Sequence, residues 1–117
     1  KGIYFIIILI FSSCNNINKN TPIGTWEYSK ELFLEEQKKL ESPKADLSDI
    51  FETIRMVFDS TDFISYLDNQ VTKGKWKIEN DSLYMFLDTH GWNKYSYKLN
   101  NNNFIIYDRD FIIALKR

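Results

Sequence analysis

Apolar residues recur at every second position along most of the chain after residue 23. The clearest runs are 24–29, 54–59, 74–79 and 94–99. Such alternation is typical of strands with one buried face and one solvated face. Short polar segments (DSTD, ENDS, DTHG and NNNN) separate the runs and read as turns. The pattern predicts about eight short strands, at approximately 24–29, 54–59, 62–68, 73–79, 82–88, 92–99, 103–108 and 110–116.

Residues 30–52 break this alternation and are rich in Glu, Lys and Leu. Pro43 divides them into a weakly amphipathic helix at about 30–41 and a second helix that begins after Asp46. Asp46 is a candidate N-cap, because its side chain can accept a bond from an unpaired amide of the first turn. The second helix carries an apolar stripe at i, i+3, i+4, i+7 spacing, made of Leu47, Ile50, Phe51 and Ile54.

Consecutive antiparallel strands in this number leave two exposed edges, and closure of the sheet into a barrel removes both. We therefore expect a mainly β fold, an antiparallel meander barrel of about eight strands with one or two helices inserted after the first strand. The interior of such a barrel holds either packed side chains or one small ligand.

Composition is consistent with one globular domain. The chain has 117 residues, of which 44% are hydrophobic and 16% aromatic, enough for a packed core. Fifteen basic and sixteen acidic side chains give a formal net charge of −1. Nucleic acid is therefore not an expected partner, because it requires a clustered basic face.

The N-terminal stretch carries Lys1, an apolar block at 3–11, then Ser12, Ser13 and Cys14. The block is about half of the roughly 20 apolar residues that a membrane-spanning helix needs, and it has the length of a signal-peptide core. Cys14 is the single cysteine, so no disulfide forms within the chain. The alternative is a buried first strand followed by an ordinary apolar cysteine.

"FSSC" resembles the lipobox of bacterial lipoproteins, although Phe11 departs from the usual aliphatic residue. The resemblance implies a signal peptide at 1–13, cleavage before Cys14, and acylation of Cys14 with a diacylglycerol and a fatty acid such as palmitate. Residues 14–22 would then form a lipidated polar tether to a barrel domain at 23–117. Asn15 is not the Asp that retains some lipoproteins at the inner membrane, so the outer membrane is the expected location. No acidic cluster follows Cys14, which favours the periplasmic face.

Three segments of the body resemble small lipocalin-like lipoproteins of the Bacteroidetes type. "IGTWEY" carries the Gly-x-Trp of the first lipocalin strand, "GKWKIENDSLYMFL" resembles an internal strand pair, and "FIIALKR" resembles the closing strand. The chain is shorter than full lipocalins, lacks disulfides and places helices after the first strand. The resemblance also implies that Arg117 or Lys116 covers the face of Trp26.

The repeated Gly-x-Trp predicts a structural role for Gly24, Trp26, Gly74 and Trp76. Glycine allows a neighbouring backbone to approach closely, and a buried indole closes the core while its N–H finds an acceptor. The alternative is direct contact of the indoles with a ligand.

No recognisable catalytic motif is present. The sequence contains no phosphate-binding loop, no nucleophile elbow and no cysteine pair, and His90 in "DTHGW" is expected to be a solvated turn residue. A metal shared by Asp88 and His90 is the less favoured alternative. We expect a protein that is not an enzyme and uses no cofactor or metal.

Two functions remain open. In the first, the barrel binds a small apolar or amphipathic ligand, with the helices of 30–52 as a lid. The expected ligand-binding residues are Phe51 of the second helix and, around the opening of the barrel, Tyr66, Tyr84, Phe86, Tyr95 and Tyr97. In the second, aromatic side chains fill the barrel, and its surface serves envelope assembly or the inhibition of hydrolases. An apolar pocket of roughly 300 Å³ or more would favour the first function, whereas room for a few waters would favour the second.

Overall fold

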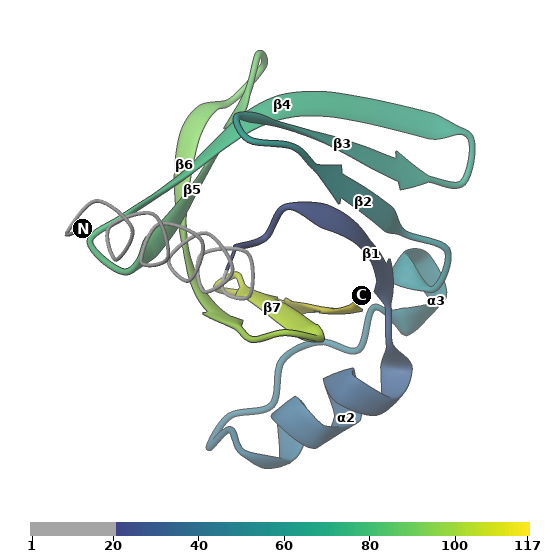
Figure 1. Cartoon of the computed structure of the whole chain (residues 1–117). Coiled ribbons are helices and arrows are strands. Elements are labelled where there is room, and N and C mark those ends of the chain that lie inside the picture. Colours follow the sequence, from purple (N-terminus) through teal and green to yellow (C-terminus); the bar gives the residue numbers. More distant parts are fainter. Residues whose placement is uncertain (1–20) are drawn as a thin grey trace, which may run out of the picture.

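A computed structural model describes residues 21–117, which form a closed barrel of eight antiparallel strands that are neighbours in sequence order (Figure 1). The predicted signal peptide, Cys14 and tether residues 15–20 lie outside the described residues. The expected meander barrel is confirmed. Its strands are β1 (Gly24–Tyr28), β2 (Arg55–Phe58), β3 (Asp62–Leu67), β4 (Gln70–Glu79), β5 (Ser82–Leu87), β6 (Gly91–Leu99), β7 (Asn103–Tyr107) and β8 (Ile112–Lys116).

The largest differences from the expected strand bounds lie at the starts of β4 and β8. β4 begins at Gln70 instead of residue 73, because the β3–β4 ladder continues to the pair Leu67↔Gln70 at the hairpin turn. β8 begins at Ile112, because the amide of Asp108 donates to the carbonyl of Phe111 and closes a turn where two further strand residues were expected.

Two helices connect β1 to β2: α2 (Lys30–Lys38) and α3 (Ser48–Phe51). Ser29 caps α2, since its hydroxyl accepts the amide of Leu32 at 3.2 Å. α3 has four residues, and the expected second helix needs two corrections. Leu47 occupies its N-cap position, although the Asp46 carboxylate does accept the amide of Ser48 at 3.0 Å.

The expected apolar stripe is also incomplete. Ile50 is 53% exposed, and Ile54 lies beyond the helix, at the start of the path into β2. A single helical turn is too short to present four stripe positions on one face.

α2 lies against the outer wall of the barrel (Figure 1). Its Leu32 and Phe33 pack on outward-facing side chains of β7 and β8, namely Ile105, Ile112 and Ala114. This contact explains why β7 and β8 are apolar on both faces. The expectation that all of 30–52 forms a lid is therefore wrong for α2.

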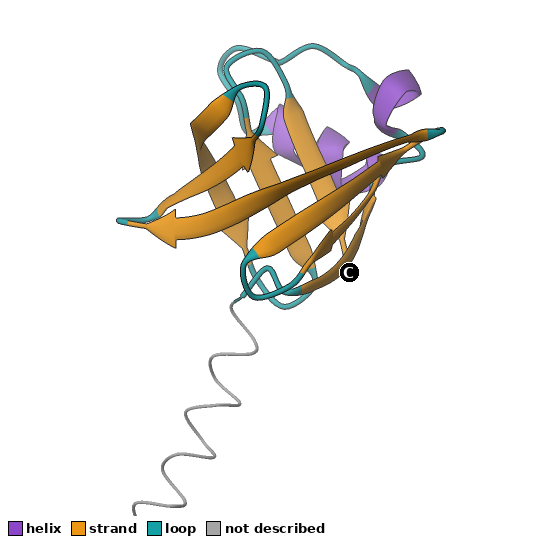
Figure 2. Cartoon of the chain, turned by 90° about the horizontal axis from the view of Figure 1, so that it is seen from above, coloured by secondary structure: helices purple, strands orange, loops and turns teal. Residues whose placement is uncertain are grey.

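The barrel has two distinct ends. The lower end contains the loops 59–61, 80–81 and 100–102, together with Ile23 and the C-terminal Arg117. The upper end contains the helical connection 29–54 and the loops 68–69, 88–90 and 108–111. In Figure 2, α3 lies near the upper end and the C-terminus near the lower end. The chain therefore passes from Thr21 into β1 at the lower end.

Candidate functional site

Aromatic side chains fill the lower half of the barrel. Trp26, Phe58 and Phe104 are at most 2% exposed. The ring of Phe104 meets Trp26 edge-to-face at a centroid distance of 5.3 Å and Phe58 at 5.5 Å, and Phe58 also contacts Trp76 at 5.9 Å. Such edge-to-face contacts add to the stabilisation from burial. The rings in this half therefore pack directly against one another.

Both Gly-x-Trp motifs lie in this filled half. The indole N–H of Trp26 donates to the carbonyl of Pro22 at 2.7 Å, and that of Trp76 donates to the carbonyl of Asp59 at 2.8 Å. A Cβ at position 74 would lie 2.2 Å from the carbonyl oxygen of Phe86, so glycine is required there for close approach. Pro22 is buried, so the fold begins inside the segment that was expected to be tether.

The upper half of the barrel contains an apolar cavity of about 180 Å³. Three of its lining residues carry hydroxyls, and the others are apolar. The lining consists of Ile54, Met56, Phe63, Ser65, Thr72, Met85, Leu87, Tyr95, Ile106, Phe111 and Ile113. The volume lies below the ~300 Å³ typical of pockets for drug-sized ligands. It resembles the roughly 150 Å³ apolar cavity, engineered in another protein, that binds benzene.

α3 stands beside the upper opening of this cavity, here called the mouth. Its Phe51 is half-buried, packs on the interior core and meets Phe111 at a centroid distance of 5.5 Å. Phe111 comes from the loop before β8 and itself lines the cavity. The two rings thus lie at the mouth, one from each side.

The expected ligand-binding residues separate into two groups. Tyr95 lines the cavity, and Phe51 lies at its mouth. Tyr97 also faces the interior but belongs to the filled half, where its ring meets Phe104 at 6.4 Å. The remaining three residues, Tyr66, Tyr84 and Phe86, lie on the outer face of the barrel.

Their outer position follows from alternation with the inward-facing residues of β3 and β5. Exposed Arg55 lies 4.6 Å from the ring centroid of Tyr66, and Lys77 lies 5.5 Å from that of Tyr84. Phe86 packs against Trp92, which is 46% exposed. The expected cavity lining is therefore corrected at these three positions.

Several cavity residues were missed from the sequence. Ser65 and Met85 share a strand face with Phe63 and Leu83, but the sequence does not show that this face points inward, because the opposite faces also carry large apolar residues. Phe111 was expected within the strand 110–116, but the structure places it in the loop before β8, where strand alternation does not set its direction.

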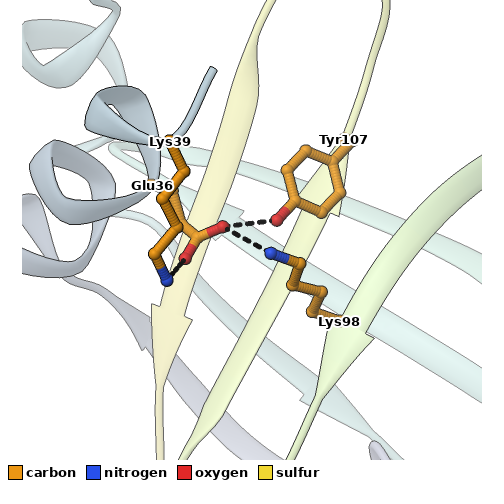
Figure 3. Close-up of polar contacts among 4 residues, drawn as sticks. All are labelled: Glu36, Lys39, Lys98 and Tyr107. Atoms are coloured by element: carbon orange, nitrogen blue, oxygen red, sulfur yellow. Dashed lines mark hydrogen bonds and ion pairs between the residues drawn. The ribbon is translucent and has the colours of Figure 1, made fainter.

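A buried carboxylate joins α2 to the barrel wall, away from the cavity (Figure 3). Glu36 is 4% exposed and accepts hydrogen bonds from the Tyr107 hydroxyl at 2.5 Å, Lys39 Nζ at 3.0 Å and Lys98 Nζ at 3.2 Å. Burial alone would raise the pKa of Glu36, but these hydrogen bonds outweigh burial and hold its pKa below the usual value. Burial and the bond to Glu36 raise the pKa of Tyr107. The cluster fixes α2 in place.

Within residues 21–117, no cluster of three or more His, Cys, Asp and Glu side chains is arranged to hold a metal ion. His90 forms a hydrogen bond through Nδ1 with the hydroxyl of its neighbour Thr89 in the exposed 88–90 loop. No helix in the described part of the chain combines the length and the apolar character needed to cross a membrane.

In comparisons with known proteins, no protein-family model, no curated protein and no solved structure matches this chain.

Proposed function

We propose that this protein is a membrane-anchored, lipocalin-like lipoprotein without enzymatic activity, whose barrel binds one small apolar ligand. The observation that supports ligand binding is the cavity in the upper half of the barrel. It is lined mainly by apolar side chains, and it lies above the aromatic rings that fill the lower half. Concave, apolar sites with few polar groups are the usual form of small-molecule sites.

The volume of the cavity favours a ligand about the size of one ring. At about 180 Å³, the cavity exceeds the roughly 150 Å³ that accommodates benzene elsewhere. A long acyl chain would need the lower half as well, which Trp26, Phe58 and Phe104 occupy.

The position of the cavity suits a lipid anchor at Cys14. The chain leaves Thr21 at the lower end, and the mouth lies at the opposite end beside α3. A barrel tethered through residues 14–20 to the periplasmic face of the outer membrane would therefore hold its mouth away from the membrane. A ligand could then reach the cavity from the periplasm.

The two methionines of the chain provide a direct test. Met56 and Met85 both line the cavity and are the only methionines in the sequence. We expect toluene to shift both ¹³C-methyl signals of the methionine-labelled protein in a saturable manner. Ser65→Leu fills the cavity and should abolish the response, whereas Ser96→Leu, on an exposed position of β6, should preserve it. Unchanged methyl signals in the wild-type protein would refute the binding proposal.

The filled lower half favours the second candidate, a structural barrel that acts through its surface in envelope assembly or in the inhibition of hydrolases. This candidate requires no ligand. It becomes the better explanation when toluene leaves both methionine signals unchanged and Ser65→Leu raises the free energy of unfolding, because the cavity would then be a simple packing defect.

A further inference from the structure

The polar groups of the cavity are three hydroxyls. Ser65 on β3 and Thr72 on β4 are direct cross-strand partners, and Tyr95 comes from β6. None of the three hydroxyls takes part in a hydrogen bond with another group among residues 21–117. No fully buried side-chain nitrogen or oxygen in this part of the chain lacks a partner, so hydroxyls without a hydrogen bond here retain some solvent-accessible surface.

Charge is absent from the lining. Among residues 21–117, the side chains that surround the cavity include no Asp, Glu, Lys or Arg. An ionised ligand would lose its hydration there without gaining a counter-ion, which is strongly unfavourable. A neutral ligand avoids this cost.

Tyr95 stands between the cavity and a polar depression at the rim, which Asp108 and Arg109 also line. Burial raises the pKa of the Tyr95 phenol, and the negative charge of Asp108 raises it further. The phenol therefore stays protonated and able to donate at neutral pH. On the cavity side, the lining offers no positive charge to a carboxylate close to Tyr95.

We infer that the cavity takes a neutral, ring-sized molecule with one acceptor oxygen, such as a carbonyl, which accepts a hydrogen bond from the Tyr95 hydroxyl. This inference rests on the proposed binding function and specifies its ligand class. The apolar wall holds the ring, and the phenol selects the acceptor. Carboxylates of the same size are excluded by the lack of positive charge.

Three probes of matched size and shape test the inference on the full chain in zwitterionic micelles. Acetophenone is neutral with an acceptor, cumene replaces the carbonyl group with an apolar one, and benzoate is an anion at neutral pH. Saturable shifts of the Met56 and Met85 methyl signals report occupancy of the cavity. We expect acetophenone to bind roughly five- to tenfold more tightly than cumene, in line with one additional hydrogen bond, and benzoate to cause no saturable shift.

The variant Tyr95→Phe removes the donor and keeps the ring. This variant should reduce the affinity for acetophenone to the level of the affinity for cumene. The affinity for cumene itself should not change. Tyr97→Phe, an inward-facing tyrosine in the filled half, is the matched control and should alter neither affinity. Folding of each variant is checked from its methyl spectrum without ligand.

The outcomes separate the inference from the function on which it rests. Equal affinities for acetophenone and cumene would overturn the role of Tyr95, and so would an unchanged preference for acetophenone in Tyr95→Phe. In both cases the proposal that the cavity binds a ligand would remain supported. Saturable binding of benzoate would overturn the preference for neutral ligands. If neither acetophenone nor cumene binds, both the proposed binding function and the inference about the ligand class are refuted.

Discussion

The guanidinium of Arg117 covers the indole of Trp26, with its central carbon 4.2 Å from the ring centroid. The same side chain donates hydrogen bonds to the carbonyl oxygens of Thr21 at 3.0 Å and Ile23 at 2.7 Å. The β1–β8 ladder of the described barrel runs through the two pairs Glu27↔Lys116 and Tyr28↔Leu115. Arg117 therefore extends the closure of the barrel below this short ladder, and the basic cover expected for Trp26 is present.

Gly24 makes room for this arrangement. Its φ of +136° is a conformation that residues with a side chain rarely adopt, and a Cβ there would lie 2.7 Å from Nη1 of Arg117. Arg117→Ala should lower the free energy of unfolding by about 1–2 kcal/mol, through loss of the cation–π contact and of the bonds to the backbone. Urea denaturation measures the change. Lys116→Ala, on the adjacent exposed position, is the control and should change stability by less than about 0.5 kcal/mol.

Trp26→Ala should lower the free energy of unfolding by about 3–5 kcal/mol, because a fully buried ring leaves a cavity in the filled half of the barrel. Trp92→Ala removes an indole that is 46% exposed and should cost much less in the same urea experiment. Similar losses in both variants would contradict the assignment of Trp26 to the core.

Glu36→Gln should weaken the attachment of α2 to the barrel wall and cost about 1–2 kcal/mol at pH 7, since both lysines lose a charged partner. The folded-state pKa of Glu36 lies below the usual value of 4.5. The carboxylate therefore contributes its full stability above about pH 4.5 and loses it as pH falls through the lower folded-state pKa.

Urea melts of wild type and Glu36→Gln between pH 7 and pH 3 measure this dependence. The stability difference should be constant down to about pH 4.5 and shrink below it. Glu35→Gln is the control, because Glu35 is exposed on the same helix. A difference that grows as the solution is acidified would contradict the direction of the pKa shift.

Phe51→Asp places a charge at the cavity mouth, where Phe51 is half-buried against Phe111. We expect weaker binding of toluene, measured by the methionine methyl signals, with a stability loss of no more than about 2 kcal/mol because the new carboxylate can reach water. Ile50→Asp, on an exposed position of the same helix, should leave binding unchanged. A loss of several kcal/mol in Phe51→Asp would indicate that α3 plugs the barrel.

Cys14→Ala tests the proposed lipid anchor, which rests on Lys1, the apolar block 3–11 and "FSSC" in the sequence. The variant should lose incorporation of radioactive palmitate and leave an uncleaved or unanchored product. Ser12→Ala keeps a small residue before the cysteine and is the matched control, with labelling retained. Palmitate labelling of Cys14→Ala at the wild-type level would refute the anchor.

Sequence reasoning succeeded where the determining interactions are local. The alternation in 24–29, 74–79 and 94–99 identified β1, β4 and β6 and their inward faces, because each has apolar residues on one side only. It failed for Tyr66, Tyr84 and Phe86, because "FISYL" and "LYMFL" carry large apolar residues on both faces. A period of two does not reveal which of two apolar faces points inward.

Local sequence patterns were thus enough to predict eight strands, their order and the two indoles that close the lower half. Tertiary structure alone decided the features that join distant residues. Arg117 bonds to Thr21 across 96 positions, Tyr107 reaches Glu36 across 71, and α2 covers the outer wall instead of the mouth. The cavity too is a result of packing, since its volume is what remains after side chains from seven strands and two connecting segments have met. Strand periodicity reports only the nearest neighbours along the chain, whereas closure and empty space depend on contacts between segments far apart in sequence.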